Sequence, residues 1–77
     1  MKREAVNKIT RKVVGQFPEM DGVQPAIRRQ EAPGNGRSLY LLTYKGQAQL
    51  PGGKSLPRIV RVVSDDEGRV IRISTSR

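Results

Sequence analysis

The side chains in this sequence that could do chemistry are mostly cations. Lysine and arginine number 15 against seven aspartate and glutamate residues, which gives a formal net charge of +8. A surplus of this kind attracts polyanions, either the phosphate backbone of a nucleic acid or an anionic membrane surface. A basic protein that is merely soluble has the same composition, so net charge alone leaves all three interpretations open.

Two groups of these cations have a spacing that could form a binding surface. One group recurs at helical spacing near the N-terminus and comprises Lys8, Arg11 and Lys12. The other alternates along segments with strand-like composition and comprises Arg28, Arg61 and Arg72. Both could contact phosphates, and Tyr40 or Tyr44 could stack on bases beside them. Lysine and arginine are also ordinary residues on solvated faces, so a purely structural interpretation stays open.

Catalysis has little support in the sequence. The chain contains no His and no Cys, so the commonest general base and the strongest nucleophile are missing. A single domain of 77 residues also offers little room for a deep substrate pocket. We therefore expect a non-enzymatic protein without a cofactor, a metal ion or a small-molecule substrate.

Two short motifs resemble ligand sites. Gly52-Gly53-Lys54-Ser55 matches the end of a phosphate-binding P-loop, but Ala48 stands where that motif needs glycine, and a strand rather than a helix should follow. We interpret the motif as a flexible basic loop. Asp65, Asp66 and Glu67 could hold a divalent cation, yet acidic residues before Gly68 are typical of a turn, and we predict a turn without metal.

The elements that must position these residues begin with a hairpin between Leu56 and Ser76. Residues 56–63 and 69–74 are rich in Val and Ile, which favour an extended backbone. Gly68 can take the left-handed conformation that closes a type I turn with a bulge. One register places Arg61 and Arg72 on the same face, and a shift of one residue places them on opposite faces. The sequence does not fix that register.

A helix is predicted over residues 3–16, because apolar side chains recur at intervals of three and four. These side chains are Ala5, Val6, Ile9, Val13 and Phe17. Gly15 is a candidate C-terminal stop, and Pro18 prevents continuation. Residues 18–25 then form a connection, because they contain two prolines and a glycine.

Two further strands are predicted before the hairpin. Ala26–Ala32 is a weak edge strand with Ile27 facing in and Arg28 facing out, and Pro33–Gly36 is a turn. Leu39–Lys45 is a central strand with bulk on both faces. Its tyrosines could lie on the open face of the sheet. This strand could continue to Gln49 with Gly46 as a bulge, followed by a loop over residues 51–57.

Together these elements predict one α+β domain over residues 1–77. Its N-terminal amphipathic helix would pack on an antiparallel meander of three or four strands and leave the other sheet face for a partner. The apolar fraction of 35% permits only a small core, which pairing with a copy or a partner would stabilise. No apolar run is long enough for a signal peptide or a membrane-spanning helix, so we expect a cytoplasmic protein without membrane insertion.

The order of a helix, a Gly-Val loop, a Tyr-containing strand and a final hairpin resembles the PepSY-like group of small domains. The resemblance is carried by Val6–Val14, Gly22-Val23, Tyr40–Thr43, Arg61–Val63 and Asp65–Val70. It implies a non-catalytic module that binds or regulates a protein partner, and it assigns no site residue.

Two main hypotheses about function follow. The first is a nucleic-acid-binding domain with little sequence specificity, because no base-reading motif is visible. The second is a protein-interaction or regulatory module, including a homodimer, that uses the open sheet face or an edge strand. It predicts Tyr40, Leu42 or Tyr44 in an exposed apolar patch. Membrane-surface binding ranks third, because Phe17 is the helix's only large aromatic anchor.

Overall fold

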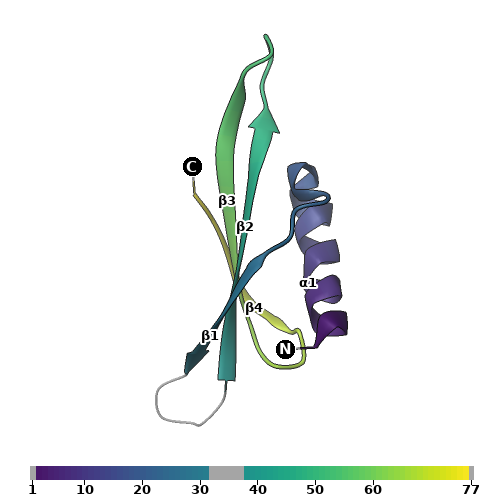
Figure 1. Cartoon of the computed structure of the whole chain (residues 1–77), viewed down its shortest axis with the longest axis vertical. Helices are drawn as coiled ribbons and strands as arrows, with labels where there is room; N and C mark the ends of the chain where they lie inside the picture. Colours follow the sequence, from purple (N-terminus) through teal and green to yellow (C-terminus); the bar gives the residue numbers. More distant parts are fainter. Residues whose placement is uncertain (1, 32–37, 77) are drawn as a thin grey trace.

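One helix packs on one face of a four-stranded antiparallel sheet in the computed structural model, which describes residues 2–31 and 38–76 (Figure 1). The elements are α1 (Arg3–Gln16), a short 3₁₀ helix η1 (Pro18–Met20), β1 (Ala26–Glu31), β2 (Ser38–Gln49), β3 (Ser55–Ser64) and β4 (Val70–Ser76). The strands lie side by side in the order of the sequence. The predicted α+β meander with an N-terminal helix is therefore confirmed, and β1 is at an edge as expected.

The helix α1 forms where the apolar period predicts it. Ala5, Ile9 and Val13 are buried against the sheet. The backbone remains helical through Gly15, which does not have a positive φ, so the predicted stop at that residue is wrong. The helix ends just before Pro18, whose ring fixes φ and whose nitrogen carries no hydrogen.

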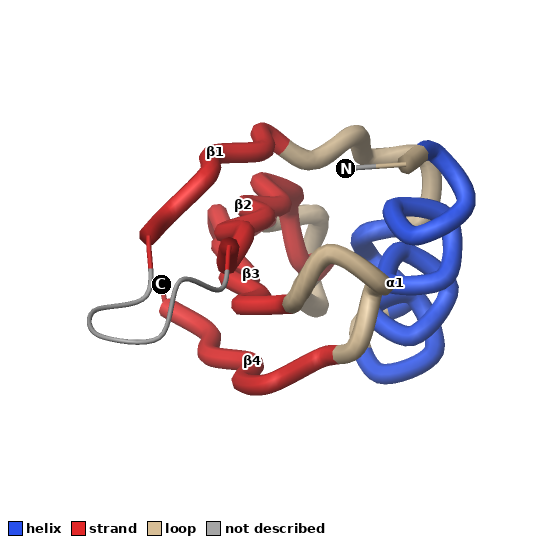
Figure 2. Tube along the Cα trace, turned by 90° about the horizontal axis from the view of Figure 1, so that it is seen from below, coloured by secondary structure: helices blue, strands red, loops and turns tan. Residues whose placement is uncertain are grey.

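The core lies between α1 and the two central strands. Its buried members are Ile9, Val13, Met20, Leu42, Tyr44, Val60 and Val62. Side chains alternate along β2 and β3, so only every second residue of each strand reaches this core. Figure 2 shows α1 on one side of the sheet, with β1 and β4 at the two edges.

Both tyrosines lie on the α1 side of the sheet, so their expected placement on the open face is wrong. Tyr40 pairs with Ser64 and Tyr44 pairs with Val60. Both of these β3 residues are buried on the side that faces the helix. Tyr44 and Leu42 are each 0% exposed, so neither forms the surface patch that the second hypothesis predicts. The physical reason is that the two tyrosines and the leucine on this face of β2 bury more apolar area under the helix than the side chains on the opposite face of β2 would bury.

The turn between β3 and β4 has the predicted chemistry. Gly68 has a φ of 85°, in the left-handed region that glycine adopts most readily. The backbone N–H groups of Glu67 and Arg69 each donate to Asp65 Oδ1 at 2.9 Å. These bonds lower the pKa of Asp65, chiefly through the N–H of Arg69. The pairing also shifts register between Val63 and Ser64, whose partners are Arg72 and Val70, so the extra residue of the bulge is Ile71 in β4, next to the turn.

The β2–β3 hairpin includes the continuation to Gln49 that the sequence allowed, and it also takes in part of the loop predicted over residues 51–57. β2 continues to Gln49, and β3 begins at Ser55. Gly46 is not a bulge, because it pairs regularly with Arg58. Glycine is favoured at this position for another reason, because a Cβ there would lie only 2.8 Å from Met20 Sδ. At the other end of the sheet, Ala32 and the turn predicted at Pro33–Gly36 lie outside the described residues.

Candidate nucleic-acid interface

The register of the β3–β4 hairpin places Arg61 and Arg72 on the same face of the sheet. Arg61 pairs with Ser74, and Val63 pairs with Arg72. Residues that pair across antiparallel strands point to the same face, as do residues two apart on one strand. The two arginines therefore occupy adjacent rows on neighbouring strands. Their face is the one opposite α1, because the alternate residues of β3 are buried under the helix.

The row that contains Arg72 crosses the whole sheet. It runs Arg28, Leu41, Val63, Arg72 from β1 to β4. An arginine thus stands at each edge, about 14 Å apart at the Cα atoms for three strand spacings of about 4.8 Å. In β2, Lys45 pairs with Ile59 and lies on the same face. We call Arg28, Lys45, Arg61 and Arg72 the basic face; all of them are exposed.

The floor of the basic face is largely apolar and only partly exposed. It consists of Leu39, Leu41, Thr43, Ile59 and Val63, each of intermediate exposure. Long cationic side chains can lie over such a floor with their aliphatic stems while their charged ends stay in water. None of the described residues in these rows is acidic, so the rows themselves contribute only positive charge to this face.

Arg58 belongs to the other side of the sheet. Its Nη1 lies 2.6 Å from Glu19 Oε1, and its guanidinium carbon lies 6.0 Å from the centre of the Phe17 ring. The pKa of Glu19 is lowered, first by a hydrogen bond from its own backbone N–H and then by Arg58, while partial burial opposes the shift. Arg58 is therefore engaged within the protein and is not part of the basic face.

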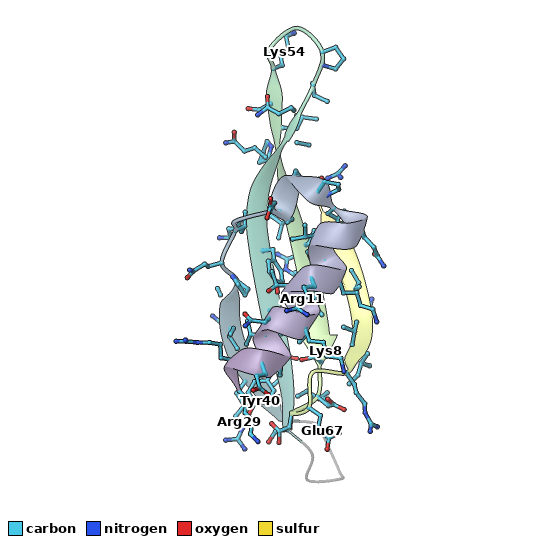
Figure 3. All side chains as sticks on the ribbon, turned by 90° about the vertical axis from the view of Figure 1, so that its right-hand side faces the viewer. Lys8, Arg11, Arg29, Tyr40, Lys54 and Glu67 are labelled. Carbon is cyan, nitrogen blue, oxygen red and sulfur yellow. The ribbon has the colours of Figure 1, made fainter. Side chains whose placement is uncertain are left out.

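The cations predicted on the helix are not brought together with those on the sheet. Lys8, Arg11 and Lys12 are exposed on α1. Figure 3 shows Lys8 and Arg11 on the side of α1 that points away from the sheet. Because α1 covers the opposite sheet face, one flat ligand cannot contact both sets of cations at once.

The tyrosines cannot provide a stacking platform on the basic face. Tyr44 is buried, with its Oη 2.7 Å from Thr10 Oγ1, and burial raises the pKa of its phenol. Tyr40 is half-buried on the α1 side, and its pKa is raised chiefly by a hydrogen bond with Asp66. Nearby, Arg29 donates to Ser38 Oγ at 2.8 Å. Both phenols are thus occupied by contacts within the protein.

Sequence reasoning missed Lys45 as a member of the basic face. The available signal was simple alternation, since Lys45 is two residues from Thr43 and four from Leu41, on the face opposite the tyrosines. It also predicted a loop over residues 51–57, whereas β3 already begins at Ser55. Gly52-Gly53-Lys54-Ser55 is the tip of this hairpin, where the Leu50 N–H donates to the Lys54 carbonyl at 2.8 Å. A strand follows it, so the helix that a P-loop requires is not there.

No helix in the described part of the chain is long and apolar enough to cross a membrane. Comparisons with protein-family models, with curated proteins and with solved structures found no match.

Proposed function

We propose that this protein is a non-catalytic nucleic-acid-binding domain whose basic face contacts phosphate groups. The observation that supports the proposal is the register, which gathers Arg28, Lys45, Arg61 and Arg72 on the face without a helix. Phosphate contacts from lysine and arginine release condensed counterions, which drives binding without regard to sequence.

The absence of tyrosine from the basic face limits what this contact can recognise. Single-strand binders that lack sequence preference usually combine cations with aromatic rings on which the bases stack. Here the rings of Tyr40 and Tyr44 lie on the α1 side. Contacts from the sheet itself are therefore to the backbone, and they confer little sequence specificity.

Charge also disfavours the homodimer that the second hypothesis includes. A two-fold dimer through this face would bring the same patch of each copy together. Four cations would then oppose four cations across a largely apolar floor, and like charges at an interface are costly. A polyanion is the better complement, and an acidic polypeptide is the competing partner that the experiment has to distinguish.

The proposal is tested by titrating the protein against labelled duplex and single-stranded oligonucleotides over a salt series. Four phosphate contacts predict that log affinity falls with log salt concentration at a slope of about −3.6 for B-DNA and about −2.8 for a single strand. No binding at low salt would contradict the proposal. Equal or tighter binding to polyglutamate of matched charge would point to an acidic polypeptide, and a dimer in a parallel mass measurement would point to self-association.

A further inference from the structure

A two-stranded ribbon projects from the sheet beside the basic face. β1 pairs with β2 only as far as Thr43, and β4 pairs with β3 only from Ile59. The pairing of residues 46–57 therefore stays within the β2–β3 hairpin, and Figure 1 shows them extending past the end of α1. We call residues 46–57 the arm. It contributes to the elongated shape of the molecule, whose extents are 49 × 23 × 16 Å.

The base of the arm is anchored to the body of the protein. The α1–β1 connection packs against it so closely that a Cβ at Gly46 would lie 3.3 Å from the Glu19 carbonyl oxygen, in addition to its overlap with Met20. The Arg58–Glu19 ion pair braces the other strand at the same level. Because both strands of the arm contact the body of the protein at their base, the orientation of the arm relative to the basic face is fixed.

The two sides of the arm differ in chemistry. One side continues the basic face beyond Lys45 and presents Gln47, Gln49 and Ser55, all exposed. The other side presents Ala48 and the exposed side chain of Leu56. The arm contains no acidic residue, and its tip includes two glycines and Lys54.

The dimensions of the arm fit one groove of double-stranded DNA. From Lys45 to Leu50 the chain advances about 17 Å, five residues at about 3.4 Å each. That exceeds the depth of the major groove, about 8.5 Å, and the major groove is wide enough, at about 12 Å, to admit a two-stranded ribbon. The minor groove of undeformed DNA, about 6 Å wide, is too narrow for the ribbon, and the major groove of duplex RNA is too narrow for side chains to read its bases.

We propose that the arm enters the major groove of double-stranded DNA while the basic face contacts the adjacent phosphates, with Gln47 and Gln49 directed at base edges. This inference rests on the proposed function. Glutamine forms a bidentate hydrogen-bonded pair with adenine in the major groove. The arm thus supplies a base contact that the sheet lacks.

Disulfide trapping tests this arrangement directly, because the chain contains no cysteine that could compete. The variant Ser55→Cys places one thiol on the polar side of the arm. It is mixed with duplexes that carry a disulfide tether either on cytosine N4, which opens into the major groove, or on guanine N2, which opens into the minor groove. A matched variant, Gln16→Cys, places the thiol on α1.

We expect the cytosine-tethered duplex to trap Ser55→Cys and the guanine-tethered duplex to trap little of it. Neither duplex should trap much of Gln16→Cys. Preference for the guanine tether, or no trapping by a duplex that still binds with the predicted salt slope, would overturn the groove inference and leave the phosphate proposal standing. If the protein instead bound no nucleic acid at all, the proposed function itself would be wrong.

A second measurement separates the arm from the basic face. Replacing both glutamines, by Gln47→Ala with Gln49→Ala, should weaken duplex binding about ten-fold, within the range for loss of a glutamine–base contact. It should leave the salt slope unchanged, because no charge is removed. Gln24→Ala, in the exposed connection before β1, is the control and should bind like the parent protein. A parent-like affinity for the arm variant would contradict base contact by the glutamines.

Discussion

Glu19 Oε1 lies 2.6 Å from Arg58 Nη1, and this ion pair joins the short helix after α1 to the base of the arm. The two residues are far apart in the sequence, so the contact fixes a tertiary relationship that no local pattern encodes. It also explains why a cation at this position takes no part in the basic face.

We expect Arg58→Gln to lower the free energy of unfolding at neutral pH. The variant should also lose less of this free energy than the parent when the pH is lowered into the acid range. The pKa of Glu19 is lowered in the folded protein, so its ionised form stabilises the fold above the ordinary range of a glutamate. That contribution is lost as the pH falls through the folded pKa. Urea unfolding at several pH values measures both effects.

Arg69→Gln is the control for the loss of charge. Arg69 pairs with Glu67 at 3.3 Å, but the two side chains are 74% and 72% exposed, and exposed ion pairs contribute little. We expect almost no change in stability from this variant. Equal losses from both variants would show that net charge matters and the position of Arg58 does not.

Gly46→Ala should destabilise the protein by about 1–3 kcal/mol, the usual cost of overpacking. The new Cβ would lie 2.8 Å from the sulfur of Met20, which is itself fully buried and has little room to move. Gly15→Ala makes the same chemical change on α1, where no side chain or other segment lies within 4 Å of the new Cβ. It should stabilise the helix by up to about 1 kcal/mol. Thermal or chemical unfolding of both variants tests the opposite signs, and a loss at Gly15 would contradict the account.

Tyr44→Phe should cost about 1 kcal/mol, because it removes the hydrogen bond with Thr10 from a packed site. Thr10→Val removes the other end of the same bond, so the double variant should lose less than the sum of the two single losses. Additive losses would mean that the two hydroxyl groups do not interact.

Stability should also fall at alkaline pH through the same side chain. The folded pKa of Tyr44 is raised by burial, so the neutral phenol favours the fold below the ordinary tyrosine pKa. This contribution is lost as the pH rises through the folded pKa. Tyr44→Phe should show a smaller alkaline loss than the parent in unfolding measured across that range, and an unchanged loss would assign it to other groups.

The features that could be predicted from the sequence are local ones. Apolar residues at intervals of three and four identify α1, and Val- and Ile-rich runs around Gly68 identify the final hairpin. Short connections between successive strands then favour a meander. Each of these patterns depends on residues that are close together in the chain.

The features that were missed depend on distant contacts. Residues 39–45 have bulk on both faces, so alternation alone could not tell which face α1 covers. Gly46 is explained by the approach of Met20, which a strand pattern cannot show. Pro57 favours a loop, but β3 is paired there by β2 alone, and proline is tolerated because the edge toward β4 is open at this position. The register of the last hairpin, in which Arg61 pairs with Ser74, is a further feature that the sequence does not fix, and it determines which arginines share the candidate site.

The central claim is that the basic face, rather than net charge, binds nucleic acid. It is tested most directly by comparing two triple variants that lose the same charge: Arg28→Gln with Arg61→Gln and Arg72→Gln on the sheet, and Lys8→Gln with Arg11→Gln and Lys12→Gln on α1. Circular dichroism first checks that both fold. The measurement is the salt dependence of duplex DNA binding.

We predict that the sheet variant loses about 2.7 from the magnitude of the salt slope, three contacts at about 0.9 each, while the helix variant keeps the parent slope. Equal loss in the two variants, or a larger loss in the helix variant, would contradict the assignment of binding to the basic face.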